Sequence, residues 1–295
     1  MTILNTANYG VYSDLINVFR LVLKSGAIDS GAILKVCQLS EGSGSRGVLG
    51  AWTQMGLFSE RNGKITVAKN FVGGKDESPD DMTVKLPDIC RGLLLDGNRE
   101  GPLWNDSPSI GTDFVKGCAW LLAQDVHGFP TSYPGVDKLV SNQMTESARG
   151  NFLSNSVPWN GLRLWMSYLG FATGSESSWQ IDPTLAIKSV LPLVFKRESK
   201  MLAKKFLSEV ASILPVLDSG NYRLEVESQL NKNVWKKEGR GRLSSSLSLA
   251  LKRLELDNVL KLRAGADAGN SYVLTGLNNQ SAGAFEGLEW SGDIS

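Results

Sequence analysis

The chain has 295 residues, with 31 Lys and Arg against 30 Asp and Glu and a single His. This length allows two or three small domains, each with its own core. The formal net charge of +1 excludes a uniformly basic nucleic-acid coat, so any charged face must be local. The apolar runs fall far short of the roughly 20 residues that a membrane span needs. Because no basic region precedes an apolar stretch at the N-terminus, we expect a cytoplasmic protein without membrane contact.

Cysteine and histidine usage excludes much metal and catalytic chemistry. The three Cys residues are widely separated and form no CxxC pair, so neither a disulfide framework nor a zinc ribbon is encoded. The only imidazole, His127, excludes a His-rich metal site, and we expect it in a turn after a helix. The motifs GxxxxGK, HExxH and GxSxG are absent. We therefore expect no enzyme, no metal and no cofactor.

Two catalytic patterns match by letter but not by context. Residues 42–47 spell GxGxxG, yet a helix precedes them, whereas a dinucleotide site needs a strand there. Asp182 followed by Glu198 and Lys200 has the spacing of a PD-(D/E)xK nuclease. That chemistry needs the Glu and Lys on a strand, and residues 197–206 have helical periodicity. Neither pattern predicts a site.

The first 75 residues follow an order of elements that recurs later in the chain. Apolar spacing predicts three short helices over residues 13–26, 32–39 and 45–55. A two-stranded hairpin follows over residues 59–67, because Asn-Gly between alternating apolar residues favours a tight primed turn. Three helices closed by a hairpin are typical of a winged helix-turn-helix, so residues 1–75 form the first expected domain.

A second copy is expected over residues 83–182. Its helices cover residues 114–126, 136–144 and 158–169, and its wing contains residues 179–182. The segments 52–58 and 165–171 both begin with Trp, carry Gly near the helix end and finish with Phe. This internal repeat favours tandem domains over an all-α protein with short Gly-terminated helices.

A third copy is expected over residues 183–275. A connecting helix over residues 183–197 leads into helices over 201–214, 222–230 and 243–254. Its wing pairs residues 259–262 with 271–274 around the Gly- and Ala-rich tip 264–270. The predicted fold class is therefore mainly α with small β-wings, in tandem winged helix-turn-helix domains.

Two segments have the composition of connectors. Residues 73–82 are Gly-rich and then acidic, which favours a solvated linker over a carboxylate metal site. Residues 276–295 contain no Lys or Arg and predict a flexible acidic tail. A docking role for Phe285 and Trp290 on a partner is the alternative for this tail.

The charge is concentrated in the third copy. Residues 196–263 contain 15 basic and 8 acidic side chains, a net charge of +7 that leaves −6 for the rest. The densest part, residues 232–242, precedes the third helix, where a winged helix meets phosphates and the edge of the major groove. A solvated basic loop would have the same composition. The nucleic-acid contacts expected in this copy are Lys232, Lys236, Lys237, Arg240, Arg242, Ser244, Ser248 and Lys252.

The other two copies are less basic. In the first, Arg46 begins the third helix, and Arg61 and Lys64 lie at the wing. In the second, Arg163 lies on the third helix. We include these four residues among the expected DNA contacts, although the first copy is equally compatible with binding a protein partner.

The N-terminal residues resemble a known family. Ile3-Leu4-Asn5-Thr6, then Gly10, Ser13 and Leu15, and the stretch from Trp52 to Phe58 are similar to the DpdG proteins of bacterial dpd islands. The resemblance covers roughly the first 70 residues. It implies a role in antiviral defence by islands that put 7-deazaguanine bases into DNA and restrict unmodified DNA. It further implies a non-catalytic accessory component that works beside a helicase, nuclease or ATPase, and it supplies no catalytic residues.

Two functions of different classes follow from these observations. The first is a winged-helix protein that binds double-stranded DNA within a restriction complex, with the third copy as its main contact. The second is a scaffold whose winged helices bind only other proteins of that complex, as a near-neutral charge allows. The sequence leaves base specificity, a homodimer and the identity of the partners open.

Overall fold

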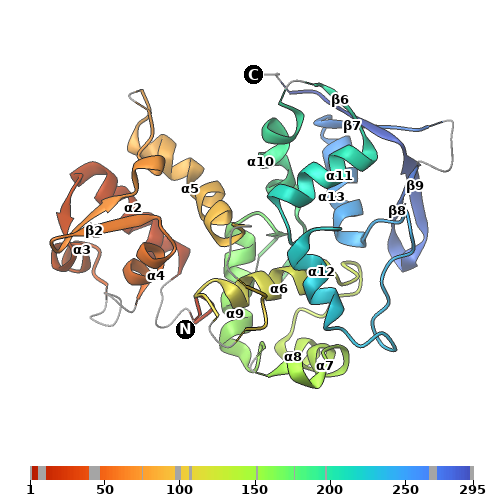
Figure 1. The fold of residues 1–295 in the computed structure, drawn as a ribbon, viewed down its shortest axis with the longest axis horizontal. Coiled ribbons are helices and arrows are strands. Elements are labelled where there is room, and N and C mark those ends of the chain that lie inside the picture. Colours follow the sequence, from red (N-terminus) through yellow and green to blue (C-terminus); the bar gives the residue numbers. More distant parts are fainter. Residues whose placement is uncertain are drawn as a thin grey trace. The chain divides into compact units, whose positions relative to one another are not determined.

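The computed structural model describes ten segments of the chain, residues 2–5, 11–39, 47–74, 76–96, 101–105, 108–150, 152–175, 177–196, 198–265 and 271–292. The described part is mainly helical, with small antiparallel sheets (Figure 1). This confirms the predicted mixture of helices with minor β-structure. No helix in these segments combines the length and apolarity required to cross a membrane.

The chain forms two compact units. Unit 1 contains Met1–Asp96, Asn105–Phe114 and Asn155–Leu169. Unit 2 contains Gly97–Trp104, Val115–Ser154 and Gly170–Ser295. The divisions expected after residues 75 and 182 are therefore not where the chain separates.

Unit 1 begins with the predicted helices and hairpin. Its first elements are α2 (Tyr12–Ser25), β1 (Ile28–Asp29), α3 (Ser30–Val36), α4 (Val48–Gln54), β2 (Phe58–Arg61) and β3 (Lys64–Val67). The strands form a sheet in the order β1-β3-β2. Asn62 and Gly63 connect β2 to β3 with φ angles of 53° and 73°. A primed turn requires positive φ at both central positions, so the Asn-Gly signal is confirmed.

Unit 1 continues with a helix that the sequence did not predict. After the short 3-10 helix η2 (Lys69–Phe71), α5 (Pro79–Leu94) begins inside the acidic segment that was expected to be a linker. Ser78 and Asp81 form a capping box at its start. The acidic residues are favourable here because carboxylates stabilise the N-terminal end of a helix. The linker prediction is therefore wrong from residue 78 onward.

Unit 2 is built from the rest of the helices and strands. Most of α6 (Thr112–Leu122) belongs to it, together with α7 (Tyr133–Gln143), α8 (Glu146–Arg149), β4 (Ala172–Thr173), β5 (Gln180–Ile181), α10 (Thr184–Phe195), β6 (Lys200–Leu202), α11 (Ala203–Ile213), α12 (Asn221–Ser228), α13 (Ser245–Leu256), β7 (Leu260–Arg263), β8 (Tyr272–Thr275), the 3-10 helix η4 (Leu277–Asn279), β9 (Ser281–Phe285) and β10 (Gly287–Trp290). The helices predicted in this part of the chain are present, with ends that differ by a few residues.

The middle repeat is divided between the units. Its third helix, α9 (Ser156–Tyr168), belongs to unit 1, whereas α7, β4 and β5 belong to unit 2. The rings explain the position of α9: Trp165 lies 5.5 Å from Trp52, and Tyr168 stacks on Tyr12 with 4.7 Å between centroids. The two Trp segments therefore belong to helices that pack together in the core of unit 1.

Residues 271–292 are folded. β7 and β8 do not pair with each other; the sheets have the orders β6-β10-β7 and β8-β9. Phe285 and Leu288 are fully buried, and Trp290 stacks on Phe195 with 5.6 Å between ring centroids. The predictions of a third wing and of a flexible acidic tail are both wrong, because these apolar side chains complete the core of unit 2. Of the expected wing tip, residues 264–270, the part from 266 to 270 lies outside the described segments.

Candidate nucleic-acid interface

The basic turn, residues 232–242, connects α12 to α13 in unit 2 (Figure 1). Trp235 anchors its first half, since the indole Nε1 donates to the Ala123 carbonyl at 3.0 Å. Arg242 anchors its end by donating from Nη1 to the Asn279 carbonyl at 3.1 Å and towards Thr275 Oγ1 at 3.4 Å. The turn is thus held at both ends by residues distant in the sequence. This restraint lowers the entropy that its side chains would lose on binding a ligand.

The turn presents cations to the solvent. Lys232, Lys236 and Arg240 are exposed, and none of them has an ion-pair partner within the described part of the chain. Lys237 is also exposed, but its Nζ lies 2.8 Å from Glu227 Oε2. The structure therefore leaves three of the predicted contacts with an uncompensated charge.

One carboxyl group lies within the turn. Glu238 is half-buried, and this burial raises the pKa of its carboxyl above the usual range. Asp218 raises the pKa further, whereas Arg242 and Arg223 oppose the shift.

Ser244 and Ser248 do not lie where a nucleic acid could touch them. They are 3% and 1% exposed. Ser244 donates from its Oγ and backbone N to the two Asp218 oxygens, at 2.6 and 2.7 Å, and its Oγ accepts from Leu247 N as the N-cap of α13. Ser248 Oγ accepts from the backbone N of Thr275 at 2.8 Å. Both serines therefore hold the fold together, which corrects their predicted role.

The start of α13 is enclosed on two sides. Ser245 and Ser246 donate to the carbonyls of Gln124 and Leu122, at 3.2 and 2.7 Å, at the end of α6. On the other side, β8 covers Ser248. A recognition helix needs an exposed N-terminal half to enter the major groove. The expectation that α13 acts in this way is therefore wrong for this conformation.

The remaining predicted contacts are scattered. Lys252 on α13 is half-exposed and forms an ion pair with Glu255 at 2.9 Å. In unit 1, Arg61 and Lys64 are exposed and lie opposite each other at the tip of the β2–β3 hairpin. Arg163 on α9 is half-buried, with its guanidinium carbon 5.9 Å from the Trp159 ring centroid. Arg46 lies outside the described residues.

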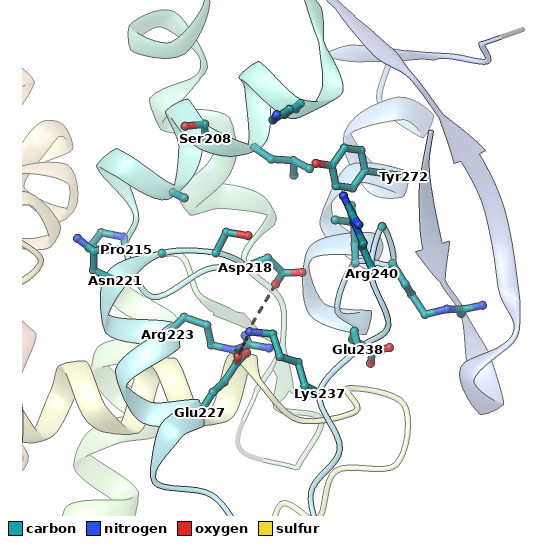
Figure 2. A pocket seen from close by; sticks show the side chains of 18 of the residues that line it. Ser208, Pro215, Asp218, Asn221, Arg223, Glu227, Lys237, Glu238, Arg240 and Tyr272 are labelled. Carbon is teal, nitrogen blue, oxygen red and sulfur yellow. Dashed lines mark hydrogen bonds and ion pairs between the residues drawn. The ribbon is translucent and has the colours of Figure 1, made fainter. Parts of the chain in front are cut away.

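A cavity of about 650 Å³ lies beside the basic turn. Figure 2 shows α11 and α12 on one side of it, and Tyr272 and Arg240 on the other. Arg223, whose side chain is 3% exposed, donates from Nε to Glu227 Oε1 at 2.6 Å. Its Nη1 lies 3.8 Å from Asp218 Oδ1 and has no hydrogen-bond partner among the described residues. A buried donor without a partner costs about 1–3 kcal/mol in folding free energy. The Nη1 group of Arg223 is therefore a polar group in the cavity whose hydrogen-bonding capacity is not used.

The sequence analysis missed this cavity. Arg223 and Glu227 are four residues apart, which would have indicated an ion pair on one helix face. No local pattern brings Asp218 or Tyr272 to the same place, since they come from separate segments.

The three cysteines are free thiols. Cys90 and Cys118 are buried and Cys37 is half-buried. Burial raises the pKa of the Cys90 thiol well above its usual range, so it stays protonated. In the segments that the structure describes, no group of three or more His, Cys, Asp or Glu side chains is arranged to hold a metal ion.

A family model described as DpdG-like matches residues 1–268. The chain belongs to the DpdG-like family. This match extends the N-terminal resemblance through unit 1 and over most of unit 2, and the family suggests an association with the dpd modification system. Strands β8, β9 and β10 lie beyond the matched residues. No curated protein and no solved structure matches the chain.

Proposed function

We propose that this DpdG-like protein is a non-catalytic component of dpd restriction that holds double-stranded DNA by its phosphates through the basic turn. The observation that carries the proposal is the exposure of Lys232, Lys236 and Arg240 on one anchored turn without ion-pair partners among the described residues. Cations of this kind supply the sequence-independent part of DNA affinity.

The burial of α13 limits what this contact can read. With Ser244 and Ser248 inside the fold, the N-terminal half of α13 does not offer these two side chains to the major groove. We therefore expect the basic turn to bind fully paired duplexes without regard to sequence, and to bind modified and ordinary duplexes equally.

A second contact is proposed for unit 1. Two observations support it: α2, β1, α3, α4, β2 and β3 follow the order expected for a winged helix, and the exposed pair Arg61 and Lys64 lies at the tip of the hairpin. A wing of this kind contacts the phosphate backbone or the minor groove. It adds affinity without supplying catalytic groups.

The test is a salt titration of the purified protein against a fluorescent duplex, prepared with ordinary and with 7-deazaguanine bases. If each of the three cations neutralises one phosphate, log Kobs should fall linearly as log salt concentration rises. The expected magnitude of the slope is about 2.7, because each neutralised phosphate contributes about 0.9. The triple variant Lys232→Gln, Lys236→Gln, Arg240→Gln should lose this part of the slope at the same pH and temperature.

The matched control changes the same number of charges elsewhere in unit 2. Lys138, Lys188 and Lys261 are exposed on α7, α10 and β7 and have no ion-pair partner among the described residues. Their replacement by Gln should leave the slope nearly unchanged. Equal losses in both triple variants would contradict a specific role of the basic turn. Absence of binding at low salt would favour the scaffold, and partner capture from the dpd complex would then be measured.

A further inference from the structure

The cavity beside the basic turn has an apolar wall. Leu207 and Ala211 on α11, Pro215, Leu243 and the rings of Tyr222 and Tyr272 line it. Its volume of about 650 Å³ lies within the range of about 300–1,000 Å³ that holds small organic ligands. The wall is therefore large enough, and apolar enough, to take a flat ring.

The buried end of the cavity is polar. Asp218 accepts two hydrogen bonds from Ser244, and Arg223 points its unpartnered Nη1 into the same region, 3.8 Å from the carboxylate. Figure 2 shows the two side chains facing each other below Ser208. A donor and an acceptor side by side match a ring edge that carries a carbonyl oxygen or ring nitrogen next to an N–H group. Nucleobases present such edges.

The exposed end of the cavity is cationic. Lys204, Lys237 and Arg240 line it, and all three are exposed. Arg240 also belongs to the basic turn, so the cavity opens where the proposed phosphate contact lies. A simple anion fits the interior poorly because it would meet Asp218 and Glu227, and a simple cation would meet Arg223.

One aromatic ring is positioned for stacking. Tyr272 lies on β8, and its ring is 6.4 Å from the buried ring of Phe285. This contact fixes the ring while one side of it faces the cavity (Figure 2). Bases stack on such rings with little dependence on sequence.

We propose that the cavity binds a single nucleotide of DNA whose base is unpaired and has left the helical stack. The base enters between the apolar wall and Tyr272, its polar edge meets Asp218 and Arg223, and its phosphate lies against Lys204 and Arg240. This inference rests on the proposed function, in which the basic turn holds the surrounding DNA. It adds that the protein distinguishes DNA with an unpaired base from a continuous duplex.

The test compares two duplexes of the same sequence, one fully paired and one with a single unpaired 2-aminopurine. The variant Ser208→Trp fills the cavity from an exposed position on α11, so it should fold. Glu209→Trp, on the next residue of the same helix and outside the cavity lining, is its control. We expect the native protein and Glu209→Trp to bind the unpaired duplex about tenfold tighter. Ser208→Trp should bind both duplexes equally and keep the affinity for the paired one.

A second variant tests the ring. Tyr272→Leu keeps an apolar side chain but removes the stacking face, and it should reduce the preference about tenfold while leaving the salt slope unchanged. Equal binding of the two duplexes by the native protein, or a preference that survives Ser208→Trp, would overturn the inference.

A third measurement separates the two proposals. Binding of free dGMP, dAMP, dCMP and TMP to the native protein and to Ser208→Trp is followed by saturation-transfer NMR. If neither duplex binds, the proposed function fails. Mononucleotide binding that Ser208→Trp abolishes would still support the cavity as a nucleotide site, and its absence would overturn that assignment as well.

Discussion

The first and the third of the expected winged helices were each predicted to contain a β-hairpin, and only the hairpin of the first is formed. In unit 1, β2 and β3 pair directly from Phe58↔Val67 to Arg61↔Lys64. In unit 2, β7 pairs with β10 and β8 pairs with β9, so neither strand meets its expected partner. The first hairpin has a two-residue turn, whereas the expected second one has a long tip without such a signal.

The difference shows when local sequence decides strand pairing. Asn62 and Gly63 adopt the positive φ values of a primed turn, so the pairing of β2 with β3 follows from two residues. For β7 the partner is chosen by burial: β10 places the fully buried Leu288 opposite Leu262, and it also pairs with β6. Long-range burial therefore overrides sequence adjacency where no tight turn is encoded.

The largest effect should come from removing the end of the chain. Truncation after Thr275 deletes η4, β9 and β10, which leaves β6 and β7 without the strand between them. We expect unit 2 to lose its cooperative unfolding transition. Hydrogen exchange should show lost amide protection in α11 and α13 and retained protection in α2 and β3. Unchanged protection in unit 2 would show that the final strands are dispensable.

A single substitution should reproduce part of this loss. Phe285→Ala empties a fully buried site at the end of β9 and should lower the free energy of unfolding by about 3–5 kcal/mol. Urea denaturation followed by tryptophan fluorescence measures it. Leu277→Ala, in the exposed η4, is the control and should change stability by less than about 0.5 kcal/mol. Similar losses in both variants would contradict the role of Phe285 in the core.

The local hairpin of unit 1 should respond through its turn. Gly63 has φ of 73° and no atom near an added Cβ, so Gly63→Ala adds only backbone strain. We expect it to destabilise unit 1 by about 1–2 kcal/mol. The matched change Gly92→Ala lies inside α5 with open space around it and should stabilise by up to about 1 kcal/mol. Thermal denaturation of the two variants measures these effects. If Gly63→Ala left the stability unchanged, the turn would not be what determines the pairing of β2 with β3.

The smallest effect concerns pH. Burial raises the pKa of the Glu238 carboxyl, so the folded state favours its protonated form. The stability that this group contributes is fully present when the pH is below the pKa of Glu238 in the unfolded state. It is lost as the pH rises through the pKa of Glu238 in the folded state. Glu238→Gln should therefore match the native Tm at acidic pH and exceed it slightly at neutral pH. A lower Tm for the variant at neutral pH would reverse the sign of the effect.

The candidate site was predictable in part. The exposed cations of the basic turn follow from a run of Lys and Arg interrupted by Gly, which no core accepts. The predicted contacts that proved wrong are the serines that follow the turn, Ser244 and Ser248, which are buried. Ser245 and Ser246 find their acceptors at Gln124 and Leu122, more than a hundred residues earlier, and no local pattern reports such partners. The cavity was missed for the same reason.

The sequence by itself determined most of the helices, the β2–β3 hairpin and the concentration of charge near residues 232–242. These features depend on periodicity, on turn chemistry and on composition, all of which act over a few residues. Tertiary structure alone decided that α9 joins unit 1, that α13 is enclosed and that the last strands complete a core. Apolar segments from any part of the chain can be buried against one another. Which segments become neighbours therefore depends on how well their shapes fit and on whether their hydrogen bonds are satisfied, and not on their distance in the sequence.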